Sequence, residues 1–179
     1  MKIVCTVFWI SFFYGVAYGQ DSVNNFQVLQ EEIVWQKVFQ TKLSFEALAE
    51  RVKDSGLLDK IELSQNKVSG ELKALDADFK GAGFAEMAAP MYIARSHFTG
   101  YAVLEYKEGR YRVTLHKILL TQRYSDPLSN QGETNHLEYY ALNSKKEINK
   151  AFQKTSGLIL DYTFSKKFDF NAVQPNKEW

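Results

Sequence analysis

Residues 98–120 read FTGYAVLEYKEGRYRVTLHKILL, and this stretch determines how the rest of the chain is expected to fold. Two runs of alternating residues meet at Glu108-Gly109, where a two-residue turn would form a β-hairpin. That turn brings apolar side chains of the two strands together on one face. The pairs are Tyr106 with Tyr111, Leu104 with Val113, and Ala102 with Leu115. A slip of one residue would scramble both faces, so the pattern itself indicates the register.

The same register places five polar or aromatic side chains on the opposite face of the hairpin. These candidate ligand-binding residues are Tyr101, Glu105, Arg112, Thr114 and His116. Glu105 is expected opposite Arg112, and Tyr101 opposite His116. A carboxylate, a guanidinium and an imidazole on rigid strands suit acid-base chemistry or ligand binding. The structural alternative is a cross-strand Glu105–Arg112 pair that contributes about 0.2 to 1 kcal/mol.

Outside this hairpin, the pattern predicts a strand, a helix and a second hairpin. Residues 33–41 are rich in β-branched and aromatic residues and have no cleanly polar face, which is typical of an interior strand. Ser44 has the position of an N-cap, and apolar residues at helical spacing continue to Asp54. Residues 61–63 and 68–75 flank a turn and predict the second hairpin.

The second half of the chain is expected to hold a long loop and a closing helix. Residues 122–142 are polar and exceed the usual length of a connection, and such loops are often either functional or disordered. Ser144 and Glu147 have the spacing of a capping box. Apolar residues then recur at steps of three and four, which predicts a helix to about Lys167.

These elements indicate an α+β fold, a curved antiparallel sheet with two helices packed on one face. We expect a single domain over residues 30–170, which includes the long loop at 122–142. A leader at residues 20–29 would precede it, and a C-terminal tail at residues 171–179 would follow it.

The N-terminus has the layout of a secretory signal peptide over residues 1–19. Lys2 precedes an apolar run at residues 3–17, and a small-residue cleavage site ends at Gly19. The run is shorter than the about 20 residues of a membrane-spanning helix, so we expect no stable membrane anchor after cleavage. Cys5, the one cysteine, lies in the segment that would be removed. We therefore expect an exported bacterial protein, periplasmic or secreted, whose mature chain has no thiol.

Composition and charge exclude several classes of protein. The chain has 45% hydrophobic and 24% charged residues, a balance that excludes disordered and coiled-coil classes. Loss of Lys2 with the signal peptide would leave equal numbers of basic and acidic residues. A neutral chain lacks the basic surface of a nucleic-acid-binding protein, so no nucleic-acid partner is expected.

The motifs predict neither a cofactor nor a metal site. The three histidines do not have the spacing of metal ligands. A run that begins at Asp76 imitates a calcium-binding loop, but Lys80 and Met87 stand where oxygen ligands are required. Nucleophile elbows, phosphate loops and dinucleotide fingerprints are absent from the sequence.

Several local phrases, taken in order, resemble one known family. They are IVWQKVF at residues 33–39, the helix after Ser44, VSGE at residues 68–71, EYKEGRYRVT at residues 105–114, and the closing helix. They are similar to an uncharacterised family of secreted bacterial (Gram-negative envelope) domains of unknown function with a TATA-binding-protein-like fold, over residues 30–170. The resemblance implies no assigned activity, cofactor or site residues. It implies no DNA binding either, because fold does not imply function.

We expect a non-enzymatic binding module of the bacterial envelope. Its partner would be a protein, peptide or glycan, bound by the exposed sheet face or by residues 122–142. Tyrosines near loops would add a recognition surface; they are Tyr92, Tyr124, Tyr139 and Tyr140.

Two alternatives stay open. A hydrolase or transferase would use carboxylates and His116 on the sheet face, and Glu105, His116 and another acid would then converge in a cleft. A structural subunit would associate with copies of itself through an edge strand.

Overall fold

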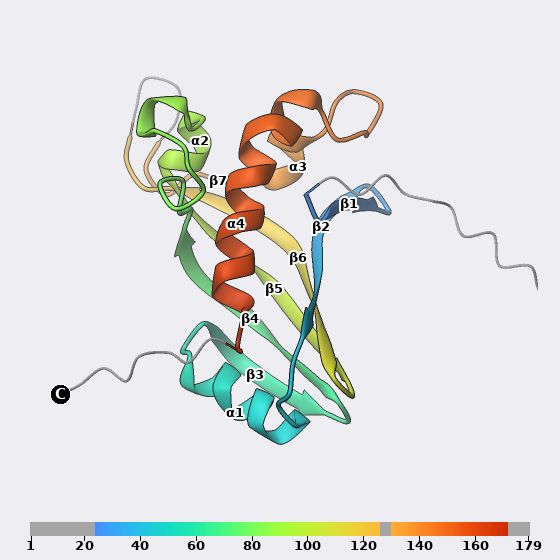
Figure 1. Ribbon diagram of the computed structural model, residues 1–179. Coiled ribbons are helices and arrows are strands. Elements are labelled where there is room, and N and C mark those ends of the chain that lie inside the picture. Colours follow the sequence, from blue (N-terminus) through green and yellow to red (C-terminus); the bar gives the residue numbers. More distant parts are fainter. Residues whose placement is uncertain (1–23, 126–129, 172–179) are drawn as a thin grey trace, which may run out of the picture.

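Seven antiparallel strands form one curved sheet in the computed structural model, which describes residues 24–125 and 130–171 (Figure 1). The sheet order is β1-β2-β6-β5-β4-β3, and β7 pairs with the far end of β6. The strands are β1 (Phe26–Leu29), β2 (Glu32–Gln40), β3 (Leu58–Ser64), β4 (Lys67–Asp76), β5 (Ser96–Lys107), β6 (Arg110–Gln122) and β7 (Thr134–His136). The predicted signal peptide at residues 1–19 and Cys5 lie outside the described residues.

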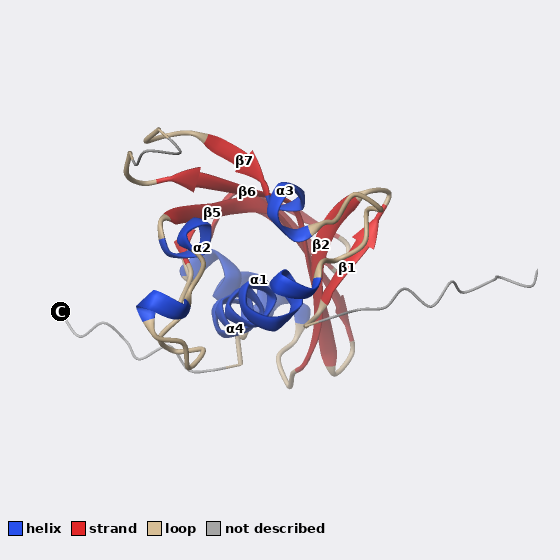
Figure 2. Ribbon diagram, turned by 90° about the horizontal axis from the view of Figure 1, so that it is seen from above, coloured by secondary structure: helices blue, strands red, loops and turns tan. Residues whose placement is uncertain are grey.

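The helices are packed on the concave face of the sheet. Figure 2 shows α1 and α4 enclosed by the curve of the strands. The helices are α1 (Phe45–Asp54), α2 (Met91–Ala94), α3 (Leu137–Ala141) and α4 (Gly157–Phe168). A 3-10 turn at Glu86–Ala88 precedes α2, and a π-helical segment at Phe152–Ser156 runs directly into α4. The predicted α+β class, with a curved antiparallel sheet and helices on one face, is confirmed.

No helix in the described part of the chain is both long enough and apolar enough to cross a membrane.

The central hairpin has the predicted register at every pair. Strands β5 and β6 place Tyr106 opposite Tyr111, Leu104 opposite Val113 and Ala102 opposite Leu115. All of these side chains except that of Tyr106 are buried. Gly109 in the connecting turn has a φ of +79°, which glycine adopts without the steric cost of a Cβ. The alternation of side chains therefore sets the buried face of the sheet.

An aromatic cluster joins α4 to the concave face. Phe164 and Phe168 are one helical turn apart on the buried side of α4, and both contact Trp35 of β2. The ring centroids of Trp35 and Phe164 are 5.5 Å apart, and those of Trp35 and Phe168 are 5.9 Å apart. The indole Nε1 of Trp35 donates a 2.8 Å hydrogen bond to Asp161 of the same helix. The buried indole therefore keeps a polar partner, as a buried tryptophan requires.

The N-terminal half of the chain otherwise follows the sequence pattern. Ser44 caps α1, and its hydroxyl accepts a 3.3 Å hydrogen bond from the backbone N–H of Ala47. Strand β2 is an interior strand between β1 and β6. Strands β3 and β4 form the predicted second hairpin.

Short elements differ from the sequence-based expectation. The predicted leader at residues 20–29 contains strand β1, which pairs with β2. The predicted loop at residues 122–142 contains β7 and α3, and residues 126–129 of it lie outside the described part. A strand of three residues and a helix of five are too short to produce a periodic pattern. Residues 172–179 of the predicted tail also lie outside the described part.

The start of the closing helix differs as well. The predicted capping box at Ser144 and Glu147 lies in a turn, where Lys146 has a φ of +62° and so cannot be helical. The observed cap is Asn149, whose side-chain oxygen accepts a 2.7 Å hydrogen bond from the N–H of Phe152. The amide nitrogen of Asn149 also donates to the carbonyl of Tyr140 at 2.8 Å.

Replacing this cap tests where the closing helix begins. The Asn149→Ala variant is expected to lose about 1 to 2 kcal/mol of unfolding free energy, because one helix N–H and one carbonyl lose their partner. Ser144→Ala is the matched control and should change stability by less than about 0.5 kcal/mol. Urea unfolding followed by tryptophan fluorescence measures both values. An equal or larger loss for Ser144→Ala would contradict the assignment.

Candidate functional site

The convex side of the sheet carries all five residues that the sequence singled out. Cross-strand partners point to the same side of a sheet, so the register groups these side chains into rows. We call these rows the outer face. It consists of Val38, Arg112, Glu105 and Lys67 in the first row, Gln36, Thr114, Val103 and Ser69 in the second, and His116, Tyr101 and Glu71 in the third.

The first row is centred on an ion pair. Nε and Nη2 of Arg112 donate hydrogen bonds of 2.9 and 2.6 Å to the same carboxylate oxygen of Glu105. The two side chains are 48% and 44% exposed, so water screens their attraction. Val38 lies opposite Arg112 on β2 and is half exposed, which adds apolar area next to the pair.

The second row is more closely packed. Thr114 is only 5% exposed although it belongs to the outer face. Its hydroxyl oxygen accepts a 3.0 Å hydrogen bond from the side-chain amide of Gln36. Thr114 is therefore tied to the neighbouring strand and presents little surface of its own.

The third row places His116 beside Tyr101, as predicted. Nδ1 of His116 is 3.7 Å from a carboxylate oxygen of Glu32. The same oxygen accepts a 2.5 Å hydrogen bond from the backbone N–H of Lys117, whose φ is +48°. Glu32 thus satisfies a backbone donor at an irregular point of β6.

The outer face keeps the predicted acid and base apart. Glu105 is opposite Arg112, and His116 lies four residues further along β6. At 3.4 Å per residue the backbone positions of the two residues are about 14 Å apart along the strands. A single substrate atom cannot contact both side chains across that distance.

At the far end of the hairpin, a carboxylate and an imidazole meet more closely than Glu32 and His116 do. Asp76 and His97 are cross-strand partners, and Oδ1 of Asp76 is 2.6 Å from Nδ1 of His97. Arg123 donates a 3.2 Å hydrogen bond to the other oxygen of Asp76. Sequence reasoning missed this pair because a register shift between Leu72 and Leu75 changes which residues face each other.

Metal ligands do not gather in the described part of the chain. Residues 24–125 and 130–171 contain no group of three His, Cys, Asp or Glu side chains that could hold an ion. In the run that imitates a calcium-binding loop, Asp78 binds the N–H of Gly81 and the ammonium of Lys166 at 2.8 and 2.9 Å. The hydrogen bond from Lys166 is the main cause that lowers the pKa of Asp78. This carboxylate connects the loop to α4.

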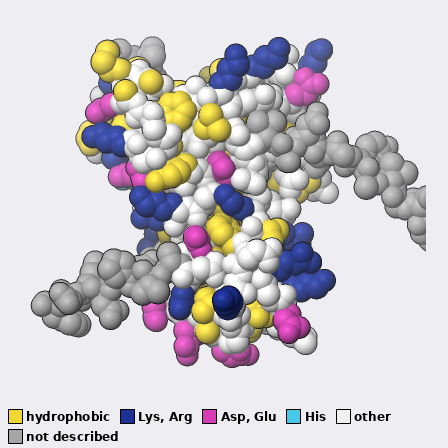
Figure 3. All heavy atoms as spheres, in the orientation of Figure 1, with side chains coloured by type: hydrophobic (Ala, Val, Ile, Leu, Met, Phe, Trp, Pro, Cys, Tyr) yellow, Lys and Arg dark blue, Asp and Glu magenta, His cyan; other side chains and the backbone are white. Residues whose placement is uncertain are grey.

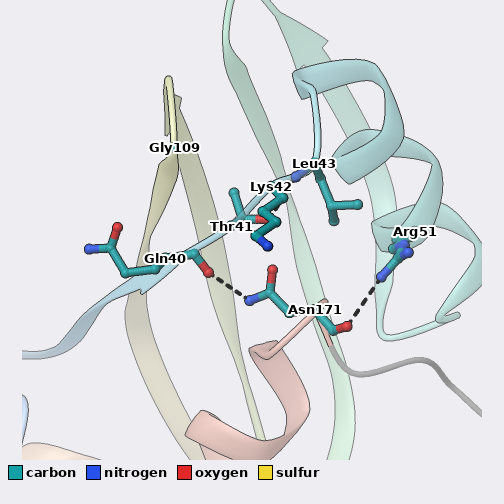
Figure 4. A pocket seen from close by; sticks show the side chains of 7 residues that line it. All are labelled: Gln40, Thr41, Lys42, Leu43, Arg51, Gly109 and Asn171. Carbon is teal, nitrogen blue, oxygen red and sulfur yellow. Dashed lines mark hydrogen bonds between the residues drawn. The ribbon is translucent and has the colours of Figure 1, made fainter.

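A pocket of about 540 Å³ lies beside the tip of the central hairpin (Figure 4). Its residues come from the end of β2, from α1, from the hairpin turn and from the segment after α4. The lining residues are Gln40, Thr41, Lys42, Leu43, Arg51, Gly109 and Asn171. Sequence reasoning missed this pocket because three distant parts of the chain build it, residues 40–51, the hairpin turn and the segment after α4, so no local motif marks it.

Backbone contacts hold the walls of the pocket together. The N–H of Thr41 donates to the carbonyl of Gly109 at 2.9 Å. The side-chain amide of Asn171 donates to the carbonyl of Gln40 at 2.9 Å, and Arg51 donates to the carbonyl of Phe170 at 2.7 Å. These contacts connect the hairpin tip, β2, α1 and the segment after α4.

Tyr111 fixes the segment that follows α4. Its buried hydroxyl donates to the carbonyl of Phe168 at 2.8 Å and accepts from the N–H of Phe170 at 2.9 Å. Burial raises the pKa of Tyr111 above its ordinary value, because the charged form would lose its hydration.

A second pocket, of about 360 Å³, lies near α2. Its residues are Glu86, Met87, Ala89, Met91, Ala94, Arg95, Arg123 and Tyr124. Apolar side chains gather over this part of the surface (Figure 3). Met87 is fully exposed, and Met91 is about half exposed.

The predicted tyrosine surface divides into two groups. The rings of Tyr92 and Tyr140 stack with centroids 4.2 Å apart, and the hydroxyl of Tyr92 is 2.6 Å from that of Ser156. Tyr124 and Tyr139 are exposed. The first two tyrosines therefore pack helices together, and the other two face solvent.

Comparison with known proteins yields similarity in fold only. A scan against protein-family models finds no match, and a search of curated proteins finds none. A TBP-like protein from Parabacteroides distasonis ATCC 8503 is similar in structure, with a TM-score of 0.47 and 14% identity over 80% of this chain and 95% of that chain. A DUF4468 family protein from Bacteroides ovatus ATCC 8483 has a TM-score of 0.44 and 18% identity over 88% of this chain and 96% of that chain.

The buried tyrosine predicts a dependence of stability on high pH. The pKa of Tyr111 is higher in the folded state than in the unfolded state. The contribution of Tyr111 to the unfolding free energy is therefore complete at pH values below the unfolded-state pKa of about 10, and it decreases as the pH rises above that pKa. Tyr111→Phe should lower the unfolding free energy by about 1 to 3 kcal/mol at pH 7, since two buried backbone groups lose their partner. The variant should also lose less stability between pH 10 and 11 than the wild type. Equal slopes in urea unfolding across this range would contradict the prediction.

The ion pair on the outer face predicts a small coupling energy. A double-mutant cycle of Glu105→Ala and Arg112→Ala should give about 0.2 to 1 kcal/mol at low salt, because both groups are half exposed. The coupling should decrease in 1 M NaCl as the charges are screened. A coupling above about 2 kcal/mol would show that the pair holds the sheet together.

Proposed function

We propose that this chain is an exported, non-enzymatic binding module of the bacterial envelope, and that it binds a partner through the outer face. The signal-peptide pattern at residues 1–19 supports export, and the neutral composition expected after cleavage supports a partner other than nucleic acid. The observation that carries the binding role is the outer face itself. Helices α1 and α4 lie on the concave side, and the sheet ladder holds all five predicted side chains in fixed rows on the other side.

The composition of the outer face supports a protein as the partner. The face combines ion-paired groups, Glu105 and Arg112, with the half-exposed Val38 and the ring of Tyr101. Tyrosine and arginine are enriched in the parts of protein surfaces that contact other proteins. Neither of the two pockets includes any of the five residues, and small ligands are usually bound in pockets. An extended partner surface therefore fits better than a small glycan or a short peptide.

A hydrolase or transferase on this face is the less favoured alternative. Such an enzyme needs an acid and a base that reach the same substrate atom. Glu105 is held by Arg112, and His116 is about 14 Å away along the strand. The arrangement therefore supports recognition more than catalysis.

Self-association through the edge strand β3 is also less favoured. Edge strand β3 has a register shift between Asp59 and Glu62, and Lys60 within it has a φ of +50°. Irregular backbone and charged residues hinder pairing with a second strand.

The proposal predicts that removal of the charged side chains of the outer face weakens partner capture. In a pull-down from envelope extract, the variant with Glu105→Ala, Arg112→Ala and His116→Ala should retain the partner roughly tenfold less well than the wild type. The control is Glu50→Ala, Lys53→Ala and Asp54→Ala, which removes exposed charges from α1. It should capture the partner normally. Undiminished capture by the outer-face variant, with unchanged thermal stability, would place the binding surface elsewhere.

A further inference from the structure

The pocket beside the hairpin tip holds two cations that lack a carboxylate partner within the described residues. Lys42 and Arg51 are the charged residues of its lining, and both are positive. Neither forms an ion pair with any residue in 24–125 or 130–171. Figure 4 shows the two side chains reaching toward Asn171, Lys42 from the connection after β2 and Arg51 from helix α1. Two like charges beside one pocket produce a positive potential that attracts an anion.

Arg51 is held in place by contacts that leave one edge of its guanidinium available. Its Nη1 donates to the backbone carbonyl of Phe170 at 2.7 Å and to that of Asn171 at 3.5 Å. Nε and Nη2 make no hydrogen bond to the described residues. These two nitrogens form the planar fork that matches the two oxygens of a carboxylate. Because the carbonyl contacts already order the side chain, binding would cost less conformational entropy.

The rest of the lining suits an anionic group attached to a short apolar stem. The hydroxyl of Thr41 accepts a 3.1 Å hydrogen bond from the N–H of Leu43, and its own proton can still be donated. Leu43 supplies an apolar wall. Asp169 is the acid next to this segment, and its Oδ1 already accepts two hydrogen bonds from Asn171 at 3.0 and 2.9 Å.

We infer that this pocket binds a carboxylate group carried by a peptide. Arg51 would bind the two oxygens through Nε and Nη2, Lys42 would add the second positive charge, and Thr41 would donate its hydroxyl proton. A volume of about 540 Å³ exceeds that of a single small anion and leaves room for the residue that carries the carboxylate. The site lies at the end of the sheet, so the inference does not depend on the outer-face proposal.

The test is a titration of the isotope-labelled full chain with a peptide, monitored by NMR. The probe is acetyl-Gly-Leu-Glu, which has two carboxylates, and the matched neutral probe is acetyl-Gly-Leu-Gln amide. The acidic peptide should shift the backbone amide signals of Lys42 and Gly109 and the Nε–H signal of Arg51. We expect a dissociation constant on the order of 1 mM that increases with NaCl concentration. Equal binding of the neutral peptide would overturn the inference.

Variants then assign the site. Lys42→Ala should weaken binding roughly threefold to tenfold, and Arg51→Gln should weaken it at least as much. Lys53→Ala is the control, because Lys53 is an exposed cation of the same helix that does not line the pocket. Arg51→Gln also removes the hydrogen bonds to the backbone carbonyls and could destabilise the fold. In that case the peptide affinity of Lys42→Ala tests the inference, because Lys42 is exposed and its side chain makes no hydrogen bond or ion pair with the described residues. Wild-type affinity in Lys42→Ala would overturn the inference, and so would tighter binding of inorganic phosphate than of the acidic peptide.

Discussion

The register of the β5–β6 hairpin is the constraint on which the rest of the structure depends. With Leu104 opposite Val113 and Ala102 opposite Leu115, these buried apolar side chains of the hairpin all face the same way. That face must be covered, and α4 contributes to the cover. Its Phe164 and Phe168 pack against Trp35 of the neighbouring strand β2, and the carbonyl of Phe168 accepts a hydrogen bond from Tyr111. The opposite face then carries Glu105, Arg112 and their neighbours. The pairing of β5 with β6 therefore determines both the core and the outer face. A shift of one residue would move the buried side chains to the outer face and the outer side chains to the core.

The same hairpin also builds the second candidate site. Its turn at Gly109 binds the backbone of Thr41, and Tyr111, two residues further on, binds both Phe168 and Phe170. These contacts bring the end of β2 and the segment after α4 to the hairpin tip, where the pocket forms. The outer face and the pocket therefore share one rigid support although they lie on different parts of the molecule. This arrangement fits a protein that binds through fixed surfaces.

Sequence reasoning succeeded where the structure is regular and local. The hairpin pairs and the Ser44 cap follow from periodicity and capping chemistry within short windows. It failed where an element is short or where distant segments meet. Strand β7 and helix α3 are too short for a periodic signal, and the true cap at Asn149 was hidden by a capping-box pattern in a turn. The Asp76–His97 pair depends on a register shift, and the pocket depends on three distant parts of the chain, so neither leaves a local pattern.

The central claim is that the outer face contacts the partner, and site-specific photo-crosslinking in cells tests it most directly. A benzoylphenylalanine in place of Tyr101 preserves an aromatic ring at the centre of the third row of the outer face. The same residue in place of Tyr162, an exposed position of α4 on the concave side, is the control. The account predicts one discrete adduct from position 101 and none from position 162. An adduct from position 162 with none from position 101 would contradict it.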